Sequence, residues 1–515
     1  MMPAPRAVRP VGRDPLSIED VVRLARGEAV PALDPDPAFR ARLHRSCEHL
    51  RKAVARGDRV YGVTTGFGDS CETEVPGTEA VEMAMNLVRF HGCGTGDFLA
   101  EDESAAVIAV RLATLAGGYS GVRVALLERL CSMLEHRILP LVPAEGSVGA
   151  SGDLTPLSYL AAAVAGERMV RFEGRDVTAA EALRAAGLQP LRLEPKESLA
   201  LMNGTSVMTA MACLAFARAR RLARTAAAVT AMASEALRGE PGHFDSRLFT
   251  AKPHPGQALC ARWIREHLAS GPVPRGRAAR VQDRYSIRCA PHVIGVLLDA
   301  LPFVRRTLEV EVNGASDNPL VDPETGDFLH GGNFYGGHVA FAMDALKTAV
   351  ASVADLLDRQ VALLCNPATS NGLPANLVLG EGRDRVAHHA FKAMQISASA
   401  LTAEALKLTM PATSFSRSTE CHNQDKVSMG TIAARDSARI LTLSERVVAI
   451  ALLASCQAAD ARGPATCSPR TREVLAAVRQ AIPPVTADRE MDRDVEDVVR
   501  RLASGEIPVG DSGEP

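Results

Sequence analysis

Three consecutive small residues, Ala150-Ser151-Gly152, could generate an electrophile from the chain itself. If the amide nitrogen of Gly152 attacks the carbonyl carbon of Ala150 and two waters leave, the backbone closes into a five-membered imidazolone. Ser151 then carries an exocyclic methylene. Gly152 leaves its nitrogen unhindered, and Ala150 is small enough for the backbone to fold back. The ring would be a conjugated electron sink, although the bare triplet also fits an ordinary loop before a helix.

The triplet lies within a longer string, Gly-Ser-Val-Gly-Ala-Ser-Gly-Asp-Leu-Thr-Pro-Leu-Ser-Tyr, that occupies residues 146–159. This string resembles the signature of the aromatic amino acid ammonia-lyases and aminomutases, which process the triplet into 4-methylidene-imidazol-5-one. The resemblance spans roughly residues 15–460 and is closest to the bacterial enzymes that act on tyrosine. Six further motifs occur in the family's order: Tyr61-Gly-Val-Thr-Thr-Gly-Phe-Gly68, Asn203-Gly-Thr-Ser206, Gln282-Asp-Arg-Tyr-Ser-Ile-Arg288, Ser316-Asp-Asn-Pro319, Gly332-Asn-Phe334 and His422-Asn-Gln-Asp425.

The resemblance implies catalytic roles for residues that are ambiguous by themselves. Tyr61, otherwise a packed loop tyrosine, matches the base that removes the β-hydrogen of the substrate. Because a phenol ordinarily has a pKa of roughly 10, we expect cations or hydrogen-bond donors near it. Arg288, otherwise a structural ion-pair residue, matches the clamp of the substrate carboxylate. Asn203, otherwise a helix N-cap, matches a residue that bonds the electrophile or substrate, and Tyr285 matches a second tyrosine that holds or moves a proton.

Two positions bear on the substrate. His91 falls where the family faces the substrate ring, and an imidazole can pair with a phenolic hydroxyl but gains nothing from benzene. Leaving it buried and unpaired would cost about 1–3 kcal/mol. Gln424 falls where histidine ammonia-lyases tend to have a glutamate, so this neutral amide disfavours histidine. With Asn203 and Arg288, the expected substrate-binding residues are Gly68, Phe90, His91, Asn333, Phe334 and Gln424.

The resemblance therefore predicts an ammonia-lyase that converts L-tyrosine to trans-4-coumarate. Phenylalanine ammonia-lyase, tyrosine 2,3-aminomutase and, less favoured, histidine ammonia-lyase stay open as alternatives. A catalytically dead helical scaffold is disfavoured because Tyr61, Ala150-Ser151-Gly152, Asn203 and Arg288 are all present. The family also implies a homotetramer with active sites shared between subunits.

Composition fits an ordinary soluble protein that binds a small molecule. Of the 515 residues, 47% are hydrophobic and 23% charged, and the net charge of −2 includes no basic tract, so we expect no nucleic-acid partner. We see no apolar run long enough for a membrane and no secretion signal, and expect a cytoplasmic protein. Eleven cysteines without a Cys-x-x-Cys pair indicate reduced thiols, and we expect no metal site, even at His388-His389.

The expected fold is mainly α: a bundle of long helices and a smaller, loop-rich N-terminal domain that carries the electrophile. Helical tracts are predicted at about 204–236, 337–364 and 430–460, and the second has an apolar stripe at steps of three and four. A helix starting after Ser17 and a hairpin within 168–195 are also predicted. The predicted domains are a mobile tail at 1–15, an N-terminal domain at 16–200, the long-helix bundle at 201–465, and a C-terminal helical segment with a loose end at 466–515.

Overall fold

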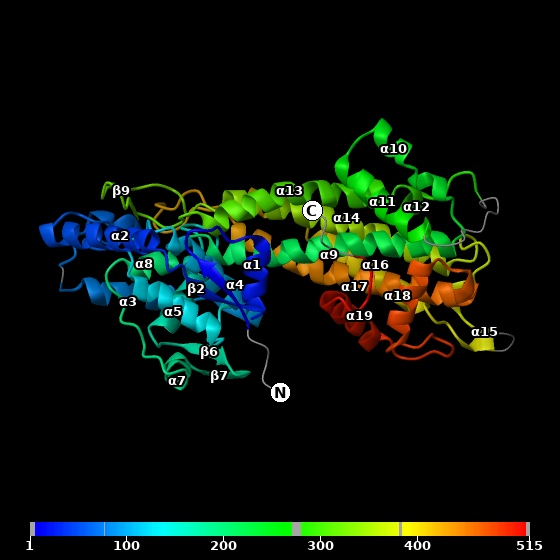
Figure 1. The fold of residues 1–515 in the computed structure, drawn as a ribbon, viewed down its shortest axis with the longest axis horizontal. Helices are drawn as coiled ribbons and strands as arrows, with labels where there is room; N and C mark the ends of the chain where they lie inside the picture. The colour runs from blue at the N-terminus through cyan, green and yellow to red at the C-terminus, as the bar shows by residue number, and fades with distance from the viewer. Residues whose placement is uncertain (1–5, 77, 270–279, 381–383, 511–515) are drawn as a thin grey trace. The chain divides into compact units, whose positions relative to one another are not determined.

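The computed structural model describes residues 6–76, 78–269, 280–380 and 384–510. Helices dominate it, and the strands form three pairs and one three-stranded sheet (Figure 1). The predicted mainly α-helical fold is confirmed.

The chain divides into two compact units, each assembled from three separate stretches. Unit 1 comprises Met1–Ala217, Arg305–Asp344 and Pro411–Arg435, and unit 2 comprises Arg218–Val304, Ala345–Met410 and Asp436–Pro515. The domains predicted from the sequence are continuous ranges, whereas these units follow contacts between distant segments. Those continuous domain boundaries therefore stay a prediction.

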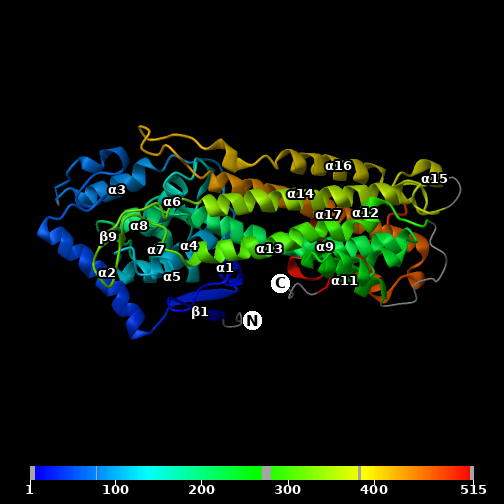
Figure 2. The ribbon, with the colours of Figure 1, turned by 90° about the horizontal axis from the view of Figure 1, so that it is seen from above.

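Four long helices pass from one unit into the other, and the three long helical tracts predicted from the sequence are among them. Within unit 2 these helices run side by side in both views (Figures 1 and 2). The predicted apolar stripe on the second tract is buried throughout, because its residues recur at helical spacing. The long helices are α9 (Ser206–Ala236), α13 (Ala290–Asn313), α14 (Gly337–Cys365) and α17 (Gly430–Arg462).

Unit 1 also contains shorter helices and strands, and one of these helices, α4, is buried along almost its whole length. This burial is consistent with the run of Ala, Val and Leu in α4. The shorter elements of unit 1 are β1 (Ala7–Val11), α1 (Ile18–Ala25), β2 (Ala29–Leu33), α2 (Pro37–Arg56), the 3₁₀ helix η1 (Gly68–Glu72), α3 (Ala80–Phe90), β3 (Thr95–Phe98), α4 (Glu101–Ala116), α5 (Val124–Glu135), β4 (Leu139–Pro140), β5 (Pro143–Glu145), α6 (Leu154–Val164), β6 (Met169–Phe172), β7 (Arg175–Thr178), α7 (Ala179–Ala185), α8 (Glu197–Met202), β8 (Leu320–Val321), β9 (Phe328–Leu329) and η4 (Ala412–Phe415).

Unit 2 holds the remaining helices, packed along the long ones. The predicted C-terminal helical segment is represented here by two helices. These elements are η2 (Pro241–Phe244), α10 (Ser246–Ala251), α11 (Pro255–Ala269), α12 (Tyr285–Arg288), η3 (Ala375–Leu377), α15 (Asp384–Ala387), α16 (Lys392–Lys407), η5 (Pro464–Thr466), α18 (Pro469–Arg479) and α19 (Asp492–Ser504).

The N-terminal segment is more ordered than its composition suggests. Ser17 caps α1 through a capping box with Asp20, as the predicted helix start requires. The predicted mobile tail is wrong for Ala7–Val11, which forms β1 and pairs in parallel with β2 in register Ala7 to Ala29. Backbone hydrogen bonds to a second strand therefore order a Pro- and Arg-containing segment that has little strand character by itself. Residues 1–5 and 511–515 of the predicted tails lie outside the described residues.

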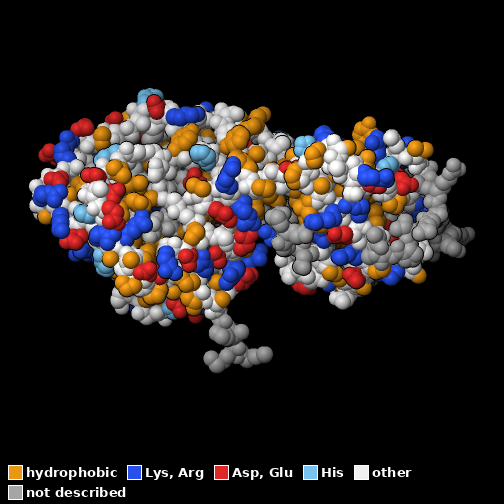
Figure 3. All heavy atoms as spheres, turned by 45° about the horizontal axis from the view of Figure 1, so that its top comes forward, with side chains coloured by type: hydrophobic (Ala, Val, Ile, Leu, Met, Phe, Trp, Pro, Cys, Tyr) orange, Lys and Arg blue, Asp and Glu red, His pale blue; other side chains and the backbone are white. Residues whose placement is uncertain are grey.

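Two helical segments, Tyr285–Asn313 and Gly430–Arg462, are long and apolar enough to cross a membrane by length and composition alone. Both segments contain charged residues, so neither is an uninterrupted apolar run, and the expectation that no segment crosses a membrane stays a prediction. The most apolar windows of the two segments are 50% and 83% buried inside the protein, and a core helix passes the same test. On the face shown in Figure 3, acidic and basic side chains alternate with hydrophobic ones without forming a basic tract.

Candidate active site

The Ala150-Ser151-Gly152 loop lies in unit 1 between β5 and α6, in a backbone that only glycine fits at two points. Gly149 and Gly152 have φ values of +69° and +72°, which side chains disfavour. Gly152 also lies directly against the backbone of Gly204, where a Cβ atom would collide with the carbonyl group. The two backbone segments are joined by the hydrogen bond from the Asp153 N–H to the Gly204 carbonyl oxygen, at 2.7 Å. The loop is therefore held in a tight, specific shape.

Two hydrogen-bond donors converge on the carbonyl oxygen of Ser151. The Asn203 side-chain amide donates to it at 2.9 Å, and the Gly204 N–H donates at 3.2 Å. This oxygen would be the carbonyl oxygen of the imidazolone ring, where negative charge develops when the ring takes up electrons. Fixed donors around such an oxygen are the arrangement that stabilises developing charge. Asn203 thus contacts the triplet from the C-cap position of α8, and its predicted role in the reaction stays a prediction.

Arg111, which the sequence analysis did not single out, fixes the backbone of Asn203 by hydrogen bonds. It lies on α4, is fully buried, and donates to the Asn203 carbonyl oxygen at 2.9 and 3.0 Å, to the Ala200 carbonyl oxygen and to the Ser206 hydroxyl. Burial lowers the pKa of Arg111 to about 10, so the guanidinium stays charged at neutral pH. The sequence signal that could have identified Arg111 is its position as a single charged residue within the apolar run of α4.

Asp153 also has a role that local reasoning did not reveal. It precedes α6 but makes no capping bond there, and its carboxylate instead accepts the N–H groups of Val207 and Met208 at the start of α9, both at 2.9 Å. The Thr431 hydroxyl donates to the other oxygen at 2.5 Å. Burial raises the pKa of Asp153 to about 6, against the lowering effect of these donors. The residue after the triplet thus fastens the loop to two long helices.

Tyr61 lies half-buried in the loop before η1. The Gly68 N–H donates to its hydroxyl oxygen at 2.8 Å, and the predicted role of Gly68 in substrate binding stays a prediction. Burial is the main cause that raises the pKa of Tyr61, and the Glu420 carboxylate raises it further. The donor demanded by the sequence is present, whereas among the described residues no cation contributes to lowering this pKa.

Gln424 lies beside the triplet, in the same segment of the chain as Glu420. The Gln424 side-chain nitrogen donates to the Ser151 hydroxyl at 3.3 Å, and its oxygen accepts from the Thr419 hydroxyl at 2.9 Å. Glu420 accepts the Asp69 N–H at 2.9 Å and so ties this segment to the Tyr61 loop. Residues 420–422 all have positive φ, between 50° and 63°, a strained conformation for side-chain-bearing residues.

His91 follows α3, and its surroundings define its protonation. The Nδ1 atom lies 3.0 Å from the Leu87 carbonyl oxygen, which can only accept, so Nδ1 carries the proton. Burial lowers the pKa of His91 below its ordinary value, which leaves the ring neutral near pH 7 and Nε2 an acceptor. The Phe90 ring lies against it, with centroids 4.3 Å apart, and is itself 62% exposed.

The remaining predicted residues have contacts of their own. Asn333 is exposed and donates to the Ala315 carbonyl oxygen at 3.1 Å, and Phe334 is half-buried. Tyr285 and Arg288 belong to α12 of unit 2, where the guanidinium lies 4.6 Å from the centre of the tyrosine ring and donates to the Asp283 carbonyl oxygen. Among the predicted residues, unit 1 therefore shows a hydrogen bond between Gly68 and Tyr61, and hydrogen bonds to Ser151 from Asn203 and Gln424.

The model of the family "Aromatic amino acid lyase" matches residues 16–480. The chain belongs to this family. The lyase is 42% identical over 453 residues to the histidine ammonia-lyase of Geobacillus kaustophilus, covering 88% of this chain and 89% of that one. Among solved structures, tyrosine aminomutase from Streptomyces globisporus is 37% identical with a TM-score of 0.90, covering 97% and 98% of the two chains. Histidine ammonia-lyase from Trypanosoma cruzi is 32% identical with a TM-score of 0.89, covering 98% and 94%.

This membership identifies the chain as a carbon–nitrogen lyase that acts on a small-molecule amino acid. In the described part of this lyase, no cluster of three or more His, Cys, Asp or Glu residues could hold a metal ion. All eleven cysteines are free thiols.

Proposed function

We propose that this lyase eliminates ammonia from L-tyrosine to give trans-4-coumarate. Ala150-Ser151-Gly152 would form its electrophile, 4-methylidene-imidazol-5-one, which would supply a methylene to take up the substrate amine and make nitrogen a better leaving group. The residues present fit this group. Only small side chains occur in the triplet, Gly152 packs against backbone, and the two donors at the Ser151 oxygen meet the future ring carbonyl.

The observation that carries the choice of tyrosine is the state of His91. With Nδ1 protonated toward Leu87 and the ring neutral, His91 offers one acceptor, Nε2. A phenolic hydroxyl can donate to that atom, and the ring of phenylalanine cannot. Gln424 adds a second argument, because a neutral amide beside Ser151 gives a substrate imidazole no negative partner.

Tyr61 supplies the base in this proposal. The Gly68 N–H holds its hydroxyl oxygen, and the raised pKa means that a further positive group must lie near it in the active enzyme. We place the family's carboxylate-binding arginine, Arg288, with Tyr285 in the active site of a neighbouring subunit of a homotetramer. Arg288 then fixes the substrate carboxylate so that the β C–H faces the Tyr61 oxygen, an orientation worth about 7–11 kcal/mol in small-molecule reactions.

Two alternatives rest on specific observations. The relative from Geobacillus kaustophilus named histidine ammonia-lyase, at 42% identity, favours histidine as substrate. The similarity to tyrosine aminomutase, with a TM-score of 0.90, favours return of ammonia to the β-carbon. Both would use the same electrophile, so the electrophile alone does not separate them.

The deciding experiment compares kcat/KM for L-tyrosine, L-phenylalanine and L-histidine with one preparation of purified protein. We expect kcat/KM for tyrosine to exceed that for phenylalanine by about 5- to 150-fold, since an unpaired buried acceptor costs about 1–3 kcal/mol. Turnover of histidine alone would show that Gln424 does not exclude it, and the proposal would be wrong.

A further inference from the structure

Unit 1 contains a cavity whose lining does not include the triplet or the other predicted site residues. A cavity of about 240 Å³ lies between α2, the loop after Tyr61 and the start of α8. This volume is below the roughly 300–1,000 Å³ typical of sites for drug-sized ligands, so it suits a short chain or a single ring. Its lining is Cys47, Leu50, Arg51, Val54, Ala55, Val63, Gly121, Glu194, Pro195 and Glu197.

One wall of the cavity is apolar. Leu50 and Val63 are buried and pack in one cluster, with the partly buried Val54 against it. Cys47 is only 7% exposed and its thiol has a pKa raised mainly by burial, so it stays neutral at pH 7. These side chains give the apolar body of a ligand a hydrophobic surface to pack against.

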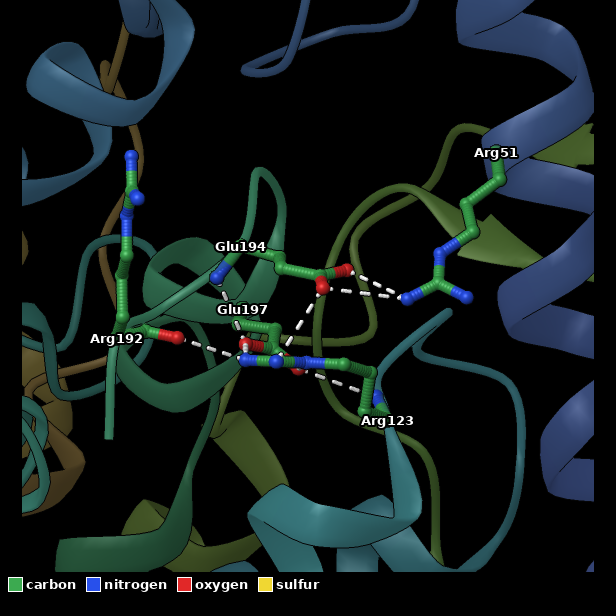
Figure 4. Close-up of polar contacts among 5 residues, drawn as sticks. All are labelled: Arg51, Arg123, Arg192, Glu194 and Glu197. Carbon is green, nitrogen blue, oxygen red and sulfur yellow. Dashed lines mark hydrogen bonds and ion pairs between the residues drawn. The ribbon is translucent and has the colours of Figure 1, made fainter. Parts of the chain in front are cut away.

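The polar side has its acceptors occupied. Glu197 accepts four hydrogen bonds, from the Arg123 backbone and guanidinium and from the Glu194 N–H. Glu194 in turn accepts from Arg51 and forms an ion pair with Arg123 at 3.2 Å. Figure 4 shows both guanidinium groups directed at Glu194, one from α2 and one from the loop before α5. A cationic ligand would find no carboxylate oxygen without donors.

Donors, by contrast, are in surplus on Arg51. In the hydrogen bonds between described residues, Arg51 donates only through Nη2, to Glu194, so Nε and Nη1 are left to meet a ligand or solvent. The Arg51 side chain is 59% exposed and lines the cavity. Charged guanidinium N–H groups form strong hydrogen bonds to anionic oxygens, and a carboxylate is a small group that supplies them.

We propose that this cavity binds a small monocarboxylate, with its apolar body against Leu50, Val54 and Val63 and its carboxylate on Arg51. The location connects the ligand to the active site on two sides. Val63 follows Tyr61 by two residues, and Glu197 is the first residue of α8, whose C-cap is Asn203. A bound carboxylate therefore contacts both the segment that carries the base and the helix that positions the Ser151 donor.

The test uses hexanoate, hexanamide and hexylamine as probes of the full-length protein by titration calorimetry. We expect hexanoate to bind once per chain, and the uncharged and cationic probes to bind at least tenfold more weakly. Arg51→Gln should weaken hexanoate at least tenfold without unfolding the protein, because exposed ion pairs contribute little to stability. Arg56→Gln, on the same helix but paired with Asp58, is the matched control and should leave binding unchanged.

Protection of the Cys47 thiol locates the bound probe. Saturating hexanoate should slow maleimide labelling of Cys47 at least fivefold, measured on its peptide by mass spectrometry, in the native protein but not in Arg51→Gln. The proposal is overturned if hexanoate does not bind, if the three probes bind equally, or if Arg51→Gln binds hexanoate like the native protein. Neither readout needs turnover, so the result is independent of the proposed lyase reaction.

Discussion

The Asn203 side-chain amide donates to the carbonyl oxygen of Ser151 at 2.9 Å, although the two residues are 52 positions apart. Together with the Gly204 N–H, it places two fixed donors on one oxygen before any substrate is present. Arg111 donates to the backbone oxygen of Asn203, so the Asn203 side chain can donate to Ser151 at the same time. The donor pair is thus preorganised by the fold, the condition under which such donors act most strongly.

Replacing Asn203 with Ala should lower kcat by about 10²–10³-fold, the usual cost of removing one such donor. The fold should survive, because Arg111 bonds the backbone of residue 203, which alanine keeps. Steady-state kinetics measures the loss, and the mass of the peptide that contains the triplet shows whether the ring still forms. Undiminished kcat in Asn203→Ala, with the ring formed, would contradict a stabilising role for this donor.

Replacing Ser151 with Ala should abolish turnover and leave the circular dichroism spectrum unchanged. Alanine has no hydroxyl to eliminate, so no exocyclic methylene can form. The peptide that contains the triplet should lack the loss of two water masses expected in the native protein. Ser147→Ala is the control, since Ser147 lies in the same loop but outside the triplet. Full activity in Ser151→Ala would exclude the electrophile mechanism.

Replacing His91 with Leu should move the preference from tyrosine toward phenylalanine by at least tenfold in the ratio of kcat/KM values. The reason is loss of the Nε2 acceptor, whose availability follows from the Nδ1 contact with Leu87. His91→Gln keeps a side-chain acceptor and should retain part of the preference for tyrosine. An unchanged ratio in His91→Leu would remove the main support for tyrosine.

Sequence reasoning located the features that are local in the chain. The Ser17 cap and three of the four long helices follow from periodicity and capping residues. The fourth, α13, was not predicted, and Pro302 within it is a residue that sequence reasoning counts against a helix interior.

The support around the site could not be predicted, because it depends on contacts between distant segments. Asp153 reads as a cap for the helix that follows it, yet its carboxylate binds the start of α9 54 and 55 positions later. Arg111 likewise bonds residues 89–95 positions away. The motifs therefore predict which residues do the chemistry, whereas the contacts that hold those residues in place are seen only in the structure.

The stability of the protein should fall in mild acid because of His267. This side chain in unit 2 is buried beside the Thr471 hydroxyl, and burial lowers its pKa to about 4, with Arg470 and Arg224 lowering it further. Since the folded pKa lies below the ordinary 6.5, its contribution is complete above pH 6.5 and is lost as pH falls toward 4. The expected loss between pH 7.5 and 5 is about 2 kcal/mol.

Denaturant unfolding at the two pH values measures this loss, and His267→Gln should be less sensitive to pH than the native protein. The exposed His44 provides the control, because His44→Gln should leave the pH dependence unchanged. Equal pH dependence of the native protein and His267→Gln would show that His267 is not the titrating group.

The most direct measurement of the proposed reaction is the product balance from L-tyrosine alone. Purified protein is incubated with L-tyrosine while coumarate is followed by its ultraviolet absorbance, ammonia by a coupled assay and β-tyrosine by chromatography. The lyase reaction predicts coumarate and ammonia in equal amounts with little β-tyrosine. Accumulation of β-tyrosine as the main product, or no conversion of tyrosine at all, would contradict it.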